Sequence, residues 1–171
     1  KLPVNDPVDI AFCSPIPPPY SFDINQTASM LGTQSASDYY ITYYDSSAQD
    51  ARDGATTGVI PNQDFGKYKV YGTSKTIWVR FEEVNGNGCV EVKPFELSVN
   101  PYPTISGDLT VCKGLQTQLT GLGTPYTSSA WTSSDTAVAT VDNNGLVSGL
   151  SLGTADISYT NANGCNATVK I

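Results

Sequence analysis

The chain has 171 residues with a formal net charge of −7, no histidine, and only 15% charged residues beside 39% hydrophobic ones, which is enough apolar material for two ordinary domains. Because the nine Lys and Arg residues are scattered singly, the chain lacks the clustered basic surface that nucleic-acid binding needs. Without histidine a Ser-His-Asp triad is impossible, and we expect no catalytic residues and no enzymatic activity.

Alternation of apolar and polar residues, which is typical of half-buried strands, dominates the chain. Residues 46–53 interrupt it and fit a short helical turn, with Ser46 as its cap and Gly54 as its end. The alternation predicts many short strands separated by turn residues, and therefore an all-β fold of the sandwich type. The clearest strands are expected at 39–43, 76–82 and 155–159, with turns at Asn87-Gly88, Asn144-Gly145 and Asn163-Gly164.

A proline-rich joint divides the chain. Pro101 and Pro103 lie within four residues, which disfavours helix and favours an extended, semi-rigid linker. We therefore expect two tandem domains, at residues 1–102 and 103–171.

Two cysteine phrases occur twice. Each expected domain begins with an Asp followed four residues later by a Cys and closes with a Cys directly after an Asn-Gly turn; the phrases are 9–13 and 108–112, and 85–89 and 161–165. No two cysteines have the C-x-x-C spacing of zinc or redox sites. The duplicated frame predicts one disulfide inside each domain, Cys13 with Cys89 and Cys112 with Cys165.

Stable disulfides form in oxidising compartments, so we expect an exported, extracellular protein. The sequence has no stretch of about 18 apolar residues, and we expect no membrane insertion. Nothing in the sequence indicates oligomerisation, and a monomer is expected.

The second half resembles a bacterial Ig-like domain of group 2 over roughly residues 104–171. The phrases that carry this resemblance are 131–141, 144–149 and 153–157. The resemblance implies an Ig-like β-sandwich. In such a sandwich Trp131 would fill the core, and Gly145 and Gly149 would form turns with positive φ.

The first half is similar to repeats of large surface adhesins of gliding bacteria that use type IX secretion, the SprB-like family. The similarity lies in residues 41–51, 76–80, 88–89 and 95–103. It implies a cell-surface filament in which repeats alternate, transmit force during adhesion and gliding motility, have neighbouring repeats as partners, and meet surface polysaccharide.

A binding module is the alternative. Asp45, Asp50 and Asp53 could supply oxygen ligands to calcium, although their spacing is not that of an EF-hand and no cofactor is otherwise expected. Thr136 lies in an Asp-Thr-Ala sequence that resembles the O-glycosylation motif of the same bacterial group. Dense tyrosines, including Tyr40 and Tyr44, could stack on sugar rings instead of packing in the core. Spacer domains of a secreted enzyme are a further alternative.

Overall fold

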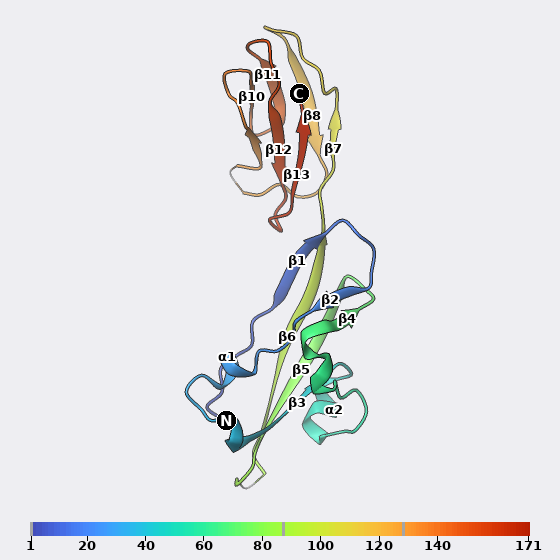
Figure 1. Cartoon of the computed structure of the whole chain (residues 1–171), viewed down its shortest axis with the longest axis vertical. Coiled ribbons are helices and arrows are strands. Elements are labelled where there is room, and N and C mark those ends of the chain that lie inside the picture. Colours follow the sequence, from blue (N-terminus) through green and yellow to red (C-terminus); the bar gives the residue numbers. More distant parts are fainter. Residues whose placement is uncertain (1, 87, 128) are drawn as a thin grey trace. The chain divides into compact units, whose positions relative to one another are not determined.

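A computed structural model describes residues 2–86, 88–127 and 129–171. The chain divides into two compact units (Figure 1). Unit 1 comprises residues 1–12 and 16–99, and unit 2 comprises residues 13–15 and 100–171. The short segment 13–15, which the sequence analysis placed in the first domain, therefore belongs with unit 2. Asn87 of the expected Asn87-Gly88 turn lies outside the described residues; Gly88 has a φ of +73°.

Unit 1 is built on a sheet with the strand order β1-β6-β5-β3. These strands are β1 (Ile10–Ser14), β6 (Val90–Pro101), β5 (Ser74–Glu83) and β3 (Tyr39–Tyr44). A second, smaller sheet pairs β2 (Tyr20–Phe22) with β4 (Tyr68–Val70). The alternation predicted for β5 is observed as alternating burial. Ile77, Val79 and Phe81 are fully buried, while Trp78 and Arg80 between them are only half-buried.

The edge strand β1 runs parallel to β6. The Asp6 carboxylate pairs with the Nζ of Lys93, and the Asp9 carboxylate accepts a 2.7 Å hydrogen bond from the backbone N–H of Glu96. Both contacts join residues 87 positions apart. Because the offset stays constant, the end of β1 lies beside the end of β6.

Short helices connect the strands of unit 1. They are α1 (Thr27–Leu31), η1 (Ala36–Asp38), α2 (Ala48–Asp53) and η2 (Asn62–Lys67). The expected helical turn is α2, which ends at Gly54 with a φ of +66°. Its cap, however, is Ser47 and not Ser46: the Ser47 hydroxyl accepts a hydrogen bond from the backbone N–H of Asp50. The other helices were not predicted, because a single turn has no repeating apolar pattern.

Unit 2 is a sandwich of two sheets. One sheet has the order β10-β11-β8-β7 and the other β13-β12-β9 (Figure 1). The strands are β7 (Ile105–Gly107), β8 (Gln116–Gly121), β9 (Trp131–Ser133), β10 (Ala139–Val141), β11 (Leu146–Gly149), β12 (Asp156–Thr160) and β13 (Asn166–Lys170). The all-β prediction is confirmed.

The core of unit 2 is formed by side chains of both sheets. Leu119 from β8 and Val147 from β11 are fully buried, as is Ile157 from β12. Trp131 is 8% exposed, and its ring lies 4.8 Å from the ring of Tyr159. A large aromatic pair thus fills the space between two sheets, where it buries far more apolar area than an aliphatic side chain.

Gly145 is required where the β10–β11 turn passes over this core. Its φ is +83°, and a Cβ added there would stand 2.4 Å from the Leu119 carbonyl oxygen and 2.9 Å from the Trp131 ring. Only glycine satisfies both the left-handed backbone and the close approach. The Asp142 carboxylate completes the turn by accepting hydrogen bonds from the backbone N–H groups of Asn144 and Leu146, at 2.8 and 2.9 Å.

Candidate functional site

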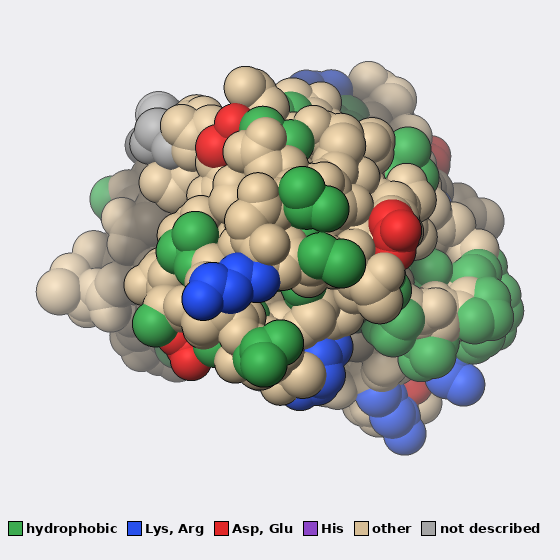
Figure 2. Space-filling model, turned by 90° about the horizontal axis from the view of Figure 1, so that it is seen from above, with side chains coloured by type: hydrophobic (Ala, Val, Ile, Leu, Met, Phe, Trp, Pro, Cys, Tyr) green, Lys and Arg blue, Asp and Glu red, His purple; other side chains and the backbone are tan. Residues whose placement is uncertain are grey.

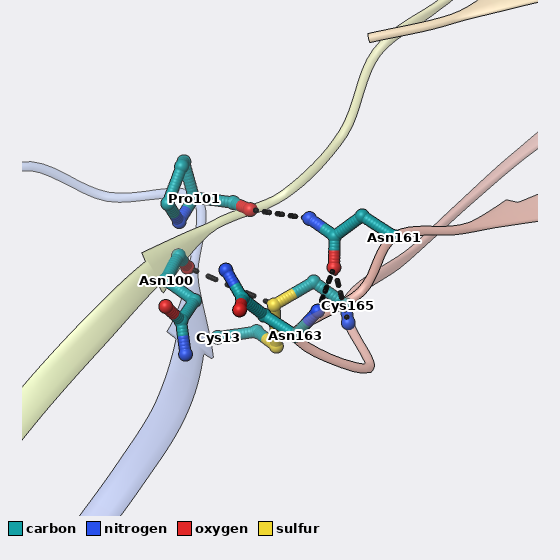
Figure 3. The surroundings of a disulfide bond; sticks show 6 residues. All are labelled: Cys13, Asn100, Pro101, Asn161, Asn163 and Cys165. Atoms are coloured by element: carbon teal, nitrogen blue, oxygen red, sulfur yellow. Dashed lines mark hydrogen bonds between the residues drawn. A yellow bond between two sulfur atoms is a disulfide. The ribbon is translucent and has the colours of Figure 1, made fainter. Parts of the chain in front are cut away.

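One disulfide joins Cys13 to Cys165, residues 152 positions apart in sequence (Figure 3). Cys13 lies near the end of β1, and Cys165 lies in the turn between β12 and β13. Their Cα atoms are 5.7 Å apart, and Cys165 is 1% exposed. The predicted pairings of Cys13 with Cys89 and of Cys112 with Cys165 are wrong, and so is the expectation of one internal disulfide in each domain.

The length of the strands explains why the predicted pairs do not form. Cys89 directly precedes β6, whereas Cys13 lies beside the far end of that strand, about 35 Å away at the usual rise per residue. Cys165 directly precedes β13, whereas Val111, the neighbour of Cys112, lines the same hollow as Ile171, which lies beyond the other end of that strand. Cys112 and Cys165 are therefore on the order of 20 Å apart. A disulfide needs Cα atoms within about 7 Å, so neither internal bridge can close.

Asn161 shapes the turn that presents Cys165. Its side-chain oxygen accepts hydrogen bonds from the backbone N–H groups of Asn163 at 3.1 Å and Cys165 at 3.0 Å. Its amide group also donates to the carbonyl oxygen of Pro101 at 3.5 Å (Figure 3). The side chain is 7% exposed and has partners for both its oxygen and its nitrogen, so it fixes the turn backbone against the start of the linker.

The linker itself meets this turn. The Cys165 Sγ lies 3.9 Å from the carbonyl oxygen of Asn100 (Figure 3). Pro101 ends β6 and is exposed, while Pro103 is buried in unit 2. The point where the main chain enters unit 2 and the point where Cys13 is bound to it are thus the same end of that unit.

Cys89 and Cys112 are free and exposed. Cys89 follows the turn between β5 and β6, and its carbonyl oxygen accepts a hydrogen bond from the N–H of Glu83 at 3.4 Å. Cys112 lies between β7 and β8. The sequence shows the four cysteines but not which two of them meet, because that depends on where each strand begins and ends.

The calcium candidates each have a protein partner. The Asp45 carboxylate accepts the Tyr68 hydroxyl at 2.8 Å, and the Asp53 carboxylate accepts the Gln49 amide at 2.9 Å. The Asp50 carboxylate accepts the Ser47 hydroxyl at 2.8 Å, and this bond lowers the pKa of Asp50. In the described part of the chain, no group of three or more Asp, Glu, Cys or His side chains is placed to hold a metal ion.

Tyr68 and Asp45 line an open hollow of about 500 Å³ beside η2. Burial raises the pKa of Tyr68, and the hydrogen bond to the Asp45 carboxylate raises it further. Two lysines and a second aspartate, Lys67, Lys69 and Asp64, also line the hollow, so side chains of both charges surround it.

The tyrosines of β3 do not divide into one buried and one exposed face. Tyr39 and Tyr43 lie in the core, as expected if one face of the strand is buried, but Tyr44 on the other face is also only 2% exposed. Tyr40 is 62% exposed. Of the two tyrosines proposed to stack on sugar rings, only Tyr40 is therefore exposed.

Thr136 lies on the exposed turn between β9 and β10. The turn is held by Asp135, whose carboxylate accepts a hydrogen bond from the Ala137 N–H at 2.9 Å. Glycosylation of Thr136 stays a prediction. Trp131, expected in the core, is placed there by β9.

These features define a class of protein: an Ig-like β-sandwich following a second β domain, with a disulfide between a strand of the first half and the last hairpin of the second. Residues 9–103 match the Flavobacterium inter-domain disulphide bond domain, and residues 91–171 match the bacterial Ig-like domain (group 2). The chain belongs to the Flavobacterium inter-domain disulphide bond domain family. The prediction of an Ig-like fold is confirmed.

Solved structures are similar to the chain at low identity. They include a 282-residue C-terminal fragment of intimin in complex with the translocated intimin receptor, at 22% identity over 63% of this chain and 44% of that chain, with a TM-score of 0.40. Sidekick-1 immunoglobulin domains 1–4 match at 9% identity over 98% of this chain and 46% of that chain, with a TM-score of 0.45. The chain spans less than half of either structure. No curated protein matches it. None of the helices among the described residues is long and apolar enough to cross a membrane.

Proposed function

We propose that the chain is a load-bearing segment of a long extracellular surface protein, of the kind found in SprB-like adhesins of gliding bacteria. The observation that carries this proposal is the 152-residue span of the Cys13–Cys165 disulfide. Any pull transmitted along the main chain from before Cys13 to after Cys165 passes through the bond between them. Residues 14–164 lie inside the closed covalent loop and carry no extending force while the bond is intact.

The effect on length is large. A fully extended chain has a length of at most about 3.6 Å per residue, so the 171 residues could span about 600 Å. With the disulfide closed, only residues 1–13 and 165–171 lie on the path, which extends to about 70 Å. One bond therefore keeps almost the whole segment from being drawn out even after its strands separate.

The location of the disulfide also suits this role. Cys165 is buried and its turn is fixed by Asn161, whereas Cys13 is half-buried, so reductants have little access to the Cys165 sulfur. The pairing also implies an oxidising, extracellular environment. Covalent protection of this kind is of use to a protein that is stretched, and the proposed partners along the load path are neighbouring repeats of the same chain.

Single-molecule stretching between the two ends tests the mechanical part. We expect an oxidised chain to lengthen by no more than about 70 Å, and a reduced chain to release about 500 Å more. A Cys13→Ser, Cys165→Ser variant should behave like the reduced chain without reductant, and a Cys89→Ser, Cys112→Ser variant like the oxidised one. An oxidised chain that releases several hundred ångströms would contradict the mechanism.

The biological part is tested on cells that display the parent protein. The Cys13→Ser, Cys165→Ser variant should attach normally at rest and detach at lower shear than the parent. If the variant resisted flow as well as the parent, load bearing would not be the role of this segment.

A further inference from the structure

The two free cysteines stand at the same places in the repeated sequence phrases as the two bonded ones. Cys89 and Cys165 each directly follow the turn of the last hairpin of their unit, β5–β6 and β12–β13. Each carbonyl oxygen accepts a backbone N–H across that turn, from Glu83 and Asn161 respectively. Cys13 lies near the end of β1, which is beside β6. Cys112 lies in the loop between β7 and β8, next to Val111, which lines the same hollow as Ile171 just after β13.

The observed bond connects one unit's opening cysteine to the next unit's closing cysteine. The opening and closing cysteines of each repeated frame lie at opposite ends of one strand, β6 for Cys13 and Cys89 and β13 for Cys112 and Cys165, and are too far apart to bond. A closing cysteine can therefore pair only with an opening cysteine that precedes its unit, and Cys165 does so with Cys13. The same rule leaves Cys89 without an opening cysteine before it and Cys112 without a closing cysteine after it.

The end of unit 2 that carries Cys112 has a second feature that indicates a partner. Four leucines are exposed around it, on loops that hydrogen bonds hold together: the Gly114 N–H donates to the Gly149 carbonyl at 2.8 Å, and the Gly149 N–H to the Leu115 carbonyl at 3.1 Å. The leucines are Leu109, Leu115, Leu150 and Leu152, the last of them 93% exposed.

These leucines surround shallow hollows. Leu115 and Leu150 line one of about 290 Å³, and Leu109 lines another with Ile171. Figure 2 looks onto this end of unit 2 and shows hydrophobic side chains at its surface. Large apolar side chains gathered at one exposed end of a unit are typical of an interaction site. Cys13, the bonded counterpart of Cys112, is by contrast half-buried.

We infer that Cys112 forms a disulfide with Cys89 of a second copy of this two-unit segment placed after it, so that the bonds continue from repeat to repeat. The inference rests on the proposed function, because it requires the segment to be followed by another with the same cysteine frame. The leucine end of unit 2 then receives the β5–β6 turn of the following copy. Each joint between units is bracketed by a disulfide, as Cys13 and Cys165 bracket the Val99–Asn100 joint here.

The chemistry is thiol–disulfide exchange with a disulfide oxidant such as oxidised glutathione. The Cys112 thiolate attacks one glutathione sulfur and displaces the other glutathione as a thiolate, giving a mixed disulfide. The thiolate of Cys89 in the second copy then attacks the Cys112 sulfur and displaces the second glutathione. Two protein thiols are oxidised, one glutathione disulfide is reduced to two thiols, and the two protons lost by the cysteines go to the glutathione thiolates.

A tandem fusion of two copies of the chain tests the inference. Ile171 joined directly to Lys1 leaves about the same number of residues between Cys165 and the next Cys13 as lie between Cys89 and Cys112. After oxidation with the glutathione couple, peptide mapping should find both Cys13–Cys165 bonds and one bond from Cys112 of the first copy to Cys89 of the second. The thiol count should be two per fusion, where unconnected copies would give four.

The matched controls use the same fusion. Cys112→Ser in the first copy should leave three free thiols, whereas Cys112→Ser in the second copy should leave one and keep the new bond. Four free thiols together with both Cys13–Cys165 bonds would overturn the inference and leave the proposed function intact. Absence of the Cys13–Cys165 bonds would instead refute the proposed function.

Discussion

The Cys13–Cys165 bond should stabilise unit 2 and have little effect on unit 1. When unit 1 is folded, β1 holds Cys13 beside the end of β6, next to Asn100. The loop that the disulfide then closes is the 65-residue span from Asn100 to Cys165, not the full 152 residues between the cysteines. On the loop-entropy estimate such a loop contributes about 4 kcal/mol to the free energy of unfolding.

The variant that tests this is Cys13→Ser, Cys165→Ser, which removes the bond without leaving new thiols. For a unit of this size we expect a fall in melting temperature on the order of 15–30 °C. The two tryptophans allow the unfolding of each unit to be followed by fluorescence, because Trp78 lies in β5 of unit 1 and Trp131 in β9 of unit 2. In a Trp78→Phe background, urea unfolding followed by fluorescence reports on unit 2 alone.

Hydrogen exchange of β5 and β12 in the same variants separates the two units. We expect exchange to rise in β12 and to stay unchanged in β5. A Cys89→Ser, Cys112→Ser variant is the matched control and should unfold like the parent. Equal rises in exchange in β5 and β12 would refute the reasoning, because the bond would then stabilise both units as one cooperative block. An unchanged urea midpoint in the Trp131 fluorescence would refute it as well.

Three further predictions concern single side chains. Gly145→Ala should destabilise unit 2 by about 1–3 kcal/mol, because of the positive φ and the contact of the added Cβ with the Leu119 carbonyl oxygen. Gly164→Ala is the control and should destabilise the unit less, since its φ is also positive, at +77°, but the space around the added Cβ is open. Equal losses of stability in fluorescence-monitored melts would contradict the packing argument. Tyr68 has a raised pKa, so it stays protonated in the folded state at pH values where it ionises in the unfolded chain. Stability should therefore be unaffected below pH about 10 and fall as the pH rises above it; Tyr68→Phe should flatten this alkaline fall in urea titrations, and an unchanged slope would count against it. Asp6→Asn should destabilise unit 1 more than Lys93→Met does, because the first leaves the buried Lys93 ammonium without its anionic partner; thermal melts with the reverse order would disprove this.

Local patterns predicted much of the fold. Alternation alone identified β3, β5 and β12, because a strand buried on one face must place apolar side chains at every second residue. Asn144-Gly145 indicated a turn because glycine adopts a positive φ, here +83° at Gly145, at little energetic cost. The helix α2 was found from its Ser-rich start and Gly54, although the sequence does not distinguish Ser46 from Ser47 as the cap, since either hydroxyl precedes the first turn.

The disulfide pairing was decided only by the tertiary structure. The sequence by itself determined that four cysteines stand in two repeated phrases, and a repeated frame favours pairing within each repeat. Strand length and direction reverse that conclusion: β6 separates Cys89 from the end of β1, and β13 separates Cys165 from Cys112. Because a disulfide reaches only about 7 Å between Cα atoms, the bond joins the cysteines that two strands bring to the same end, whatever their distance in sequence.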